Sequence, residues 1–244
     1  MKDSIFTIKQ NVALTSSVYK MLLAGDCSEI TAPGQFINIK LDGLYLRRPI
    51  SVCDCEGDIV TIIYKVVGKG TEQLSQMQVG QELLILTGLG NGYDTSCSGN
   101  QPLLLGGGVG VPPLYMLAKK LIAEGKTPTV VLGFNTKDEV FYDDEFSALG
   151  CNTIVATADG TLGKKGFVTD CLPKIYSYVF TCGPEPMLKA VYKNIITSGQ
   201  FSFEERMGCG FGACMGCSCK TITGYKRICA DGPVLCKEEI LWED

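Results

Sequence analysis

Four cysteines near the end of the chain have a spacing that suits an iron–sulfur cluster. The segment reads Cys209-Gly-Phe-Gly-Ala-Cys214-Met-Gly-Cys217, and Cys229 follows downstream. A C-x4-C-x2-C run with a more distant fourth cysteine is typical of plant-type [2Fe–2S] ferredoxins. Glycines at 208, 210, 212 and 216 let the backbone curl around an inorganic core and bring amide N–H groups to the sulfurs. The pattern predicts a [2Fe–2S] centre with these four ligands.

A structural zinc site with four cysteine ligands is the alternative. Its usual signature is a pair of short C-x2–4-C knuckles, whereas here three cysteines cluster and the fourth stands alone. The spacing therefore favours the cluster over zinc. Cys219 and Cys236 are spare, and we expect each to be a small buried residue rather than a ligand.

Two Gly/Pro turns indicate a nucleotide site. The first, Gly106-Gly107-Gly108-Val-Gly110, joins an apolar run to a segment that opens with two prolines. Glycines let a pyrophosphate approach the backbone, and a helix N-terminus supplies partial positive charge. The run is not a strict G-x-G-x-x-G fingerprint, so a tight turn without a ligand is the alternative. The second turn, Cys182-Gly183-Pro184, stands where another strand should meet a helix, and ligands bind at such strand ends.

Two further segments could hold phosphates. Arg47-Arg48-Pro49-Ile50-Ser51 offers a guanidinium fork and a hydroxyl within a β-rich run, although an exposed basic pair on a strand is equally consistent. Gly68-Lys69-Gly70-Thr71 precedes a helical stretch, and a threonine capping that helix would make a second phosphate cradle.

The composition excludes several kinds of chemistry. The 244 residues include no histidine and thirteen cysteines, which rules out histidine-based nucleophile systems, Rieske clusters and His-ligated zinc. A net charge of −4 without a basic stripe argues against nucleic acid. The polar segment 1–10 does not resemble a signal peptide, and the apolar stretch 102–118 holds four glycines and three prolines, unlike a membrane span. We therefore expect a cytoplasmic protein that makes no contact with a membrane.

The elements that would position these residues fall into three segments. Short β-rich runs at 35–41, 45–53, 59–67 and 81–86 predict an antiparallel barrel or sandwich. Strands at 103–105, 129–133, 153–156 and 178–181 alternate with helices at 112–124, 143–149 and 185–197, which predicts a doubly wound parallel sheet. We expect the Gly- and Cys-rich remainder to be too small to fold without a metal centre. The predicted domains are therefore a barrel over 1–99, an α/β domain over 100–202 and a cluster module over 203–244.

Taken in order, these motifs resemble the ferredoxin–NADP reductase superfamily and, within it, the electron-transfer subunits of type B dihydroorotate dehydrogenase. The resemblance covers essentially the whole chain. Its most specific part is the cysteine set with the ending Cys229-Ala-Asp231-Gly232-Pro233. It implies a β-barrel FAD domain, a doubly wound NAD domain and a small C-terminal [2Fe–2S] module.

The resemblance also implies roles for individual residues. FAD would be held on the barrel by the residues Arg48, Pro49, Ile50, Ser51, Ile63, Tyr64, Lys65, Gly70 and Thr71. The nicotinamide nucleotide would be held by the residues Gly106, Gly107, Gly108, Gly110, Gly183 and Pro184. Cys182 would lie at the nicotinamide–flavin contact as a catalytic residue. A flavin suits this place because it exchanges hydride with nicotinamide and single electrons with a cluster.

The partner implied is an FMN-containing dihydroorotate dehydrogenase catalytic subunit, in a hetero-oligomer such as a heterotetramer. Electrons would pass from it through the cluster and FAD to NAD+, as a step of pyrimidine biosynthesis. Nothing in this sequence looks like a site for the pyrimidine itself, which is expected if that chemistry lies in another chain.

Three departures from the superfamily pattern stand out. Ile50 replaces the usual tyrosine of Arg-x-Tyr-Ser, so flavin stacking on that side must differ. The gap from Cys217 to Cys229 is shorter than in plant ferredoxins, which requires a compact loop. The segment 133–137 lacks an arginine for a 2′-phosphate, which favours NAD over NADP, although Lys137 leaves NADP open.

Other functions fit parts of the pattern. A similar subunit of a ferredoxin-dependent NADP reductase, a sulfide dehydrogenase or a sulfite reductase would keep the chemistry and change the partner. A zinc-stapled adaptor would only bind nucleotide, and an NADH:flavin reductase could use the tail as a docking surface. The four cysteines together favour the dihydroorotate branch.

Overall fold

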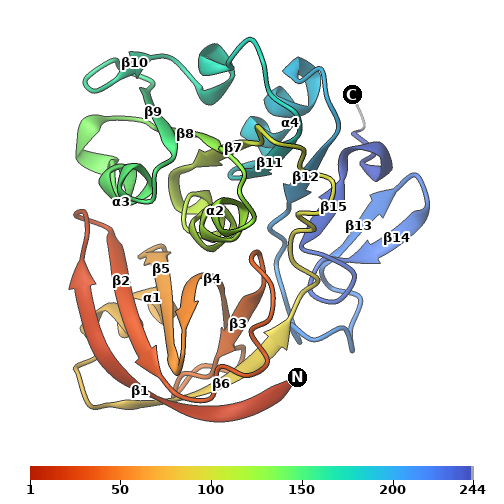
Figure 1. The fold of residues 1–244 in the computed structure, drawn as a ribbon. Helices are drawn as coiled ribbons and strands as arrows, with labels where there is room; N and C mark the ends of the chain where they lie inside the picture. The colour runs from red at the N-terminus through yellow and green to blue at the C-terminus, as the bar shows by residue number, and fades with distance from the viewer. Residues whose placement is uncertain (243–244) are drawn as a thin grey trace.

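The computed structural model describes residues 1–242 and begins with a closed antiparallel barrel (Figure 1). The strands lie in the order β1-β2-β5-β4-β3-β6, and side chains such as Met21, Leu23 and Ile37 fill the interior. The six strands and the helix α1, which follows β5, are β1 (Lys2–Ala13), β2 (Val18–Ala24), β3 (Phe36–Ile39), β4 (Arg48–Glu56), β5 (Ile59–Lys65), β6 (Glu82–Leu89) and α1 (Lys69–Gln76). The predicted barrel is confirmed.

The strands β1 and β2 were not among the predicted β-rich runs. In β1 only Phe6 and Ile8 are buried, and the other positions are exposed or half-buried. The strand is long because its backbone pairs with β2 on one side and β6 on the other. Pairing with distant segments therefore decides this strand, and local hydrophobicity gives little sign of it.

A seven-stranded sheet forms the second layer, in the order β10-β9-β8-β7-β11-β12-β15. Its strands are parallel except for the last pair. The strands and helices are β7 (Leu103–Gly107), α2 (Pro113–Ala123), β8 (Thr129–Phe134), α3 (Asp143–Ala148), β9 (Asn152–Thr157), β10 (Lys164–Lys165), β11 (Val179–Cys182), α4 (Glu185–Asn194), β12 (Gly199–Ser202) and β15 (Val234–Cys236). From β7 the chain adds β8, β9 and β10 on one side of the sheet and then β11 and β12 on the other. The strand order therefore switches between β7 and β11, and open α/β sheets bind ligands at such a switch point.

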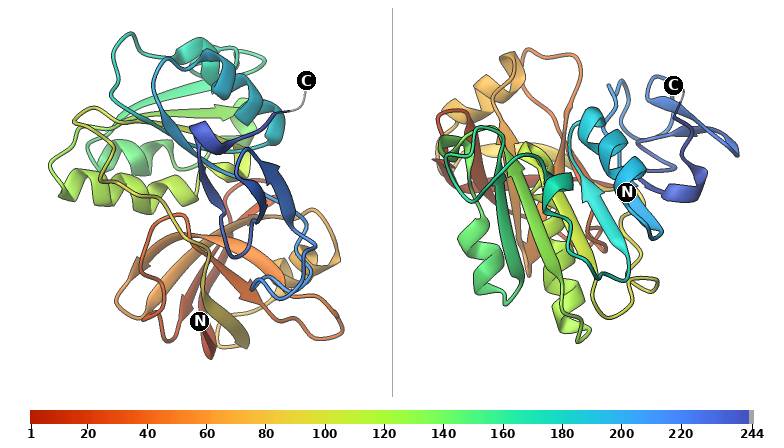
Figure 2. Two further views of the ribbon diagram at one scale, coloured as in Figure 1. Left: turned by 90° about the vertical axis from the view of Figure 1, so that its right-hand side faces the viewer. Right: turned by 90° about the horizontal axis from the view of Figure 1, so that it is seen from above.

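The cysteine-rich segment is built onto the edge of this sheet (Figure 2). A hairpin of β13 (Ser218–Thr221) and β14 (Gly224–Arg227) follows residues 208–217, which we call the cysteine loop, and β15 then pairs antiparallel with β12. Cys217, Ile228 and Cys229 share one apolar cluster with Phe201 of β12. The module therefore draws part of its support from the nucleotide domain, and the domain limits at residues 99 and 202 stay predictions.

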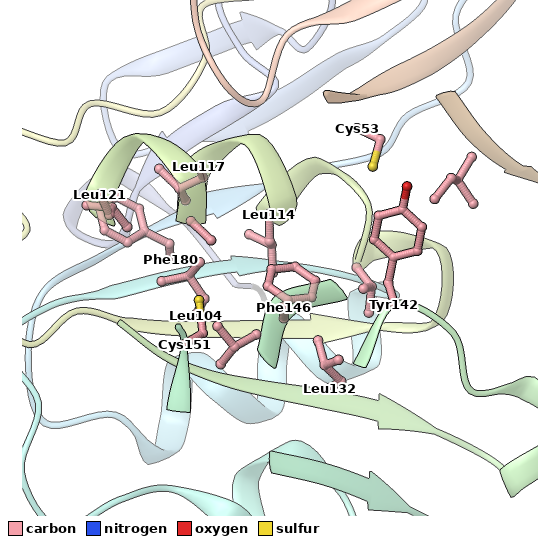
Figure 3. Packing of buried hydrophobic residues seen from close by; sticks show 14 of the residues in the cluster. Cys53, Leu104, Leu114, Leu117, Leu121, Leu132, Tyr142, Phe146, Cys151 and Phe180 are labelled. Atoms are coloured by element: carbon pink, nitrogen blue, oxygen red, sulfur yellow. The ribbon is translucent and has the colours of Figure 1, made fainter. Parts of the chain in front are cut away.

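A continuous core joins the barrel to the nucleotide domain. Cys53 of β4 lies in one apolar cluster with Leu114 and Phe146, and the Tyr142 hydroxyl points toward its thiol (Figure 3). At the rim of this contact, Lys119 Nζ of α2 lies 2.7 Å from Asp54 Oδ2 of β4. The two domains therefore hold the ligand-binding turns in a set relation to each other.

Candidate functional site

The two predicted nucleotide turns meet at the switch point of the sheet. Cys182 at the end of β11 is in register with Gly106 at the end of β7. A Cβ atom on Gly110 would lie 2.3 Å from the Cys182 carbonyl oxygen, and one on Gly107 would lie 2.5 Å from the Met187 sulfur. The structure thus brings the Gly106–Gly110 turn and the Cys182-Gly183-Pro184 turn into direct contact.

The glycines of the Gly106–Gly110 turn are of two kinds. The space beside Gly106, Gly107 and Gly110 is filled by atoms of the protein itself, so any side chain there would collide with its neighbours. Gly108 differs, because its φ is +52° and no atom lies within 4 Å of where a Cβ would stand. Gly108 is therefore the position at which a phosphate can approach the backbone, beside the start of α2.

Cys182 is held in a small polar network between the two domains. Ser202, the residue paired with Cys182 across β11 and β12, lies near both the Cys182 thiol and the Tyr93 hydroxyl. Tyr93 also donates to the Thr181 carbonyl at 3.0 Å. Burial, only partly offset by Ser202, raises the pKa of the Cys182 thiol to about 12. The thiol is therefore neutral near pH 7 and suits packing or hydrogen bonding better than nucleophilic attack.

At the open end of the barrel, Arg48 and the Gly68–Thr71 turn form one cradle. The Arg48 guanidinium covers Gly70, where a Cβ would lie 2.2 Å from Nε. The Thr71 hydroxyl accepts hydrogen bonds from the amides of Val67 at 2.9 Å and Gly68 at 3.3 Å. A guanidinium beside the first turn of α1 fits a diphosphate such as that of FAD. The Thr71 hydroxyl therefore stabilises the Gly68–Thr71 turn itself.

The remaining residues predicted to hold FAD divide between the two faces of the barrel wall. Pro49 and Ser51 of β4 are paired with Asn38 and Phe36 of β3, on the face away from the barrel interior. Ile50 packs against the apolar interior of the barrel, so its side chain points away from the face that carries Pro49 and Ser51.

Two of the predicted residues on β5 are buried. Ile63 belongs to the core shared with α2, and the Tyr64 hydroxyl donates to Asn11 Oδ1 at 3.0 Å. Their side chains serve the fold, whereas the side chain of Lys65 is exposed.

The four predicted ligands come together as two pairs of thiols. The Cys214 amide donates to Cys209 Sγ at 3.4 Å, and the Cys229 amide donates to Cys217 Sγ at the same distance. The thiols within each pair also lie close enough to influence each other's pKa. Within residues 1–242, no three Cys, Asp or Glu side chains converge closely enough to surround one metal ion. Two thiol pairs match a two-iron cluster, in which each iron takes two cysteine sulfurs.

Backbone amides already favour the thiolate form at one of these cysteines. Partial burial opposes ionisation of Cys209, but the amides of Cys214, Phe211 and Ala213 outweigh it and lower its pKa to about 6. Cys229 is the opposite case, because burial and the adjacent Cys217 thiol raise its pKa to about 12, although the Gly212 amide donates to its sulfur at 3.1 Å. Amide donors of this kind stabilise anionic sulfur, as an iron–sulfur site requires.

Several supporting residues were not predicted from the sequence. Arg227 donates to the Gly212 carbonyl at 2.6 Å and pairs with Asp231, which fastens the cysteine loop to the hairpin. Asn91, just after the barrel, donates to the Val234 carbonyl at 2.8 Å and accepts from the Val234 amide at 3.1 Å. The Asp231-Gly232-Pro233 ending was the available signal, and its contacts depend on the tertiary fold.

This architecture and these sites define a flavin-dependent reductase that carries an iron–sulfur module. A solved structure with the same overall fold is described as an NADH-dependent reduced ferredoxin–NADP oxidoreductase studied for flavin-based electron bifurcation. It aligns with a TM-score of 0.88 and 31% identity over 97% of this chain and 90% of its own. The ferredoxin reductase of carbazole 1,9a-dioxygenase shares the fold, with a TM-score of 0.69 and 22% identity over 79% of this chain and 64% of its own.

Curated relatives make the family specific. A protein of Fusobacterium nucleatum is 44% identical over 98% of this chain and 99% of its own, and one of Geobacillus sp. is 42% identical over 99% of each. Both are named dihydroorotate dehydrogenase B (NAD(+)), electron transfer subunit. The model of the iron–sulfur cluster binding domain of dihydroorotate dehydrogenase B matches residues 204–241, and an oxidoreductase NAD-binding domain matches residues 104–193. The chain belongs to the family of dihydroorotate dehydrogenase B electron transfer subunits.

The family confirms the predicted class of oxidoreductase subunit and its cofactors, which are FAD, a [2Fe–2S] cluster and NAD. The match at 204–241 favours the cluster over structural zinc for the four cysteines. The roles assigned to single residues, Cys182 included, stay predictions that rest on the geometry above.

Proposed function

We propose that this chain receives electrons from an FMN-containing dihydroorotate dehydrogenase catalytic subunit and delivers them to NAD+ in pyrimidine biosynthesis. Two contacts carry the proposal. Asn38 of β3 binds the cysteine loop, and Cys53 of β4, the strand paired with β3, lies in one apolar cluster with Cys182. When bound, FAD and the cluster supply the conversion between two-electron exchange with nicotinamide and one-electron transfer.

The protein's own groups divide this work. Arg48 and the first turn of α1 hold the diphosphate of FAD, and Pro49 and Ser51 face its ring. The open side of Gly108 receives the phosphates of the nicotinamide nucleotide. The neutral Cys182 thiol packs where nicotinamide and flavin meet, which keeps water from the reacting atoms.

The end of β8 favours NAD over NADP. Glu139 accepts a hydrogen bond from Asn135 Nδ2 at 2.8 Å, which holds a carboxylate beside the strand end next to the Gly106–Gly110 turn. A carboxylate there accepts hydrogen bonds from ribose hydroxyls and repels a 2′-phosphate. Lys137 donates its backbone amide to Thr161 at 2.9 Å. We expect a kcat/KM for NADH at least tenfold above that for NADPH, and the reverse preference in the native protein would contradict this assignment.

The partner is a catalytic subunit that itself holds FMN and the pyrimidine. Among residues 1–242 no helix combines the length and apolarity that crossing a bilayer requires. A cytoplasmic location and a heterotetramer stay predictions.

Anaerobic purification followed by iron, zinc, sulfide and flavin analysis tests the proposal. We expect about two irons, two sulfides and one FAD per chain, with a rhombic EPR signal after reduction. The isolated chain should oxidise NADH with artificial acceptors and leave dihydroorotate unchanged until the catalytic subunit is added. Zinc without sulfide or flavin would overturn the function, and dihydroorotate oxidation by the isolated chain would overturn the division of labour between subunits.

A further inference from the structure

Asn38 is a buried polar residue between the barrel wall and the cysteine loop. It is 2% exposed, and its Nδ2 donates to the Cys209 carbonyl at 3.3 Å. Gly210 is a glycine for the same reason, because a Cβ at that position would lie 2.3 Å from Nδ2. The loop that carries the first cluster ligand is therefore shaped around the Asn38 amide.

The other end of the same amide has no partner. Asn38 Oδ1 is buried and accepts no hydrogen bond from any of residues 1–242. Turning the amide over would not help, since the carbonyl oxygen of Cys209 needs a donor and only Nδ2 provides one. A buried acceptor without a partner loses its hydrogen bonds to water and gains none, so native proteins seldom leave one unless a ligand or water supplies the donor.

The register of β3 shows what lies beside this oxygen. Ile37 and Ile39 point into the barrel and are fully buried, so Asn38 projects from the opposite face. Asn38 is paired with Pro49, and the paired side chains of an antiparallel ladder project from the same face. Asn38 thus stands between the cysteine loop and the face of β4 that carries Pro49, where FAD is proposed above to bind.

We propose that Asn38 is a positioning residue that joins the two redox sites, with Nδ2 holding the Cys209 carbonyl and Oδ1 accepting a hydrogen bond from the bound flavin. The inference rests on the proposed function, since it requires FAD on β4. Oxidised flavin offers two kinds of donor, the imide N–H of the ring and the ribityl hydroxyls, and both supply what Oδ1 lacks. One side chain would then set the spacing between cluster and flavin, on which electron transfer depends.

The test compares Asn38→Leu with Asn91→Leu in the full chain. Asn91 also fastens the module to the barrel, but both ends of its amide are satisfied within the protein. The dissociation constant of FAD, measured by flavin fluorescence after removal and readdition of FAD, should rise about tenfold in Asn38→Leu. The dissociation constant of FAD should keep its native value in Asn91→Leu. Bleaching of the cluster in air should accelerate in both variants.

A second pair of measurements separates a direct contact from a general loosening of the fold. Asn38→Asp keeps an acceptor oxygen and sets its second oxygen against the Cys209 carbonyl, so cluster bleaching should accelerate while the FAD affinity stays within about threefold of native. FAD methylated at the imide nitrogen then identifies the donor. If it binds native protein more weakly but Asn38→Leu no worse than FAD, the imide is the donor; equal losses in both proteins assign the ribityl hydroxyls.

An unchanged FAD dissociation constant in Asn38→Leu would overturn the inference and leave the orphan oxygen to water. That result is distinct from failure of the proposed function, in which the native chain itself would hold neither FAD nor cluster.

Discussion

The turn after β7 and the cysteine loop before β13 are both rich in glycine, but they depend on different supports. In the first, Gly107 and Gly110 press against Met187 and the Cys182 carbonyl, so the turn is assembled by packing within the protein. In the second, Gly210 and Gly212 have φ values of +76° and +87°, so the backbone conformation itself favours glycine, in addition to the contacts with Asn38 and Ala230. Protein atoms fill the space beside the glycines of the first loop, whereas the second loop brings thiols together in two pairs that a cluster would join.

The difference shows that glycine content alone does not identify a ligand site. A glycine that avoids a collision with the protein's own backbone looks the same in a sequence as one that admits a phosphate or allows a left-handed turn. Substitutions at these positions should separate the three cases, and the expected effects below run from the largest to the smallest.

Loss of one cysteine ligand should abolish the [2Fe–2S] cluster of the cysteine loop entirely. In Cys214→Ala we expect iron and sulfide to fall from about two per chain to near zero, because one iron keeps only a single protein sulfur. FAD should stay bound, since Arg48 and the Gly68–Thr71 turn lie on the barrel. Metal analysis and EPR measure the outcome. Cys219→Ala removes a nearby thiol on β13 as the control, and a normal cluster signal in Cys214→Ala would show that the ligand set is wrong.

A substitution at Gly110, in the Gly106–Gly110 turn, should act mainly on the stability of the fold. Gly110→Ala places a methyl group 2.3 Å from the Cys182 carbonyl oxygen and 2.5 Å from its carbon, so backbone must move. We expect a loss of about 3 kcal/mol in the free energy of unfolding, measured by urea denaturation.

Gly108→Ala is the matched comparison, because it adds a methyl group in open space at a φ of +52°. Its cost should be about 1 kcal/mol from backbone strain. Its main effect should be a higher KM for NADH, since the methyl group occupies the predicted phosphate position. If both variants changed stability and KM alike, the distinction between packing glycines and the ligand-facing glycine would fail.

In the cysteine loop, a glycine substitution should act through the cluster. Gly212→Ala must hold alanine at a φ of +87° and brings its Cβ within 2.8 Å of the Ala230 Cβ. The Gly212 amide that donates to Cys229 Sγ would shift, so we expect bleaching of the cluster in air about tenfold faster. Gly224→Ala, in the turn of the β13–β14 hairpin at a φ of +118° with open space around it, should bleach at the native rate. Equal bleaching of the two variants would mean that backbone strain anywhere in the module suffices.

The smallest effect should come from a support outside the loop. Arg227→Met removes the donor to the Gly212 carbonyl and the pairing with Asp231. A single half-exposed contact of this kind contributes about 1 kcal/mol, so bleaching should be about fivefold faster with the EPR line shape retained. Lys226→Met, which breaks only the neighbouring pair with Glu239, is the control. A changed EPR line shape in Arg227→Met would show that Arg227 affects the electronic structure of the cluster directly, which the contacts of Arg227 do not indicate.

Much of this protein follows from the sequence alone. The C-x4-C-x2-C spacing of Cys209, Cys214 and Cys217 predicts a cluster because four thiolates around two irons leave few arrangements of chain. The alternation of apolar runs and helical segments after residue 100 predicts the doubly wound sheet, since parallel strands require crossovers. Both are local or short-range features, which a sequence records directly.

The tertiary structure decided the rest. Strand β1 is mostly polar and exists because two other strands pair with it. The strand β15 of the cysteine-rich module pairs with the edge of β12. Asn38 contacts Cys209, which lies 171 positions further along the sequence. Whether a glycine serves packing, as Gly110 does, or a ligand, as Gly108 does, depends on which atoms the fold brings beside it. Contacts of this range have no local signature, because their energy arises only when distant segments are packed together.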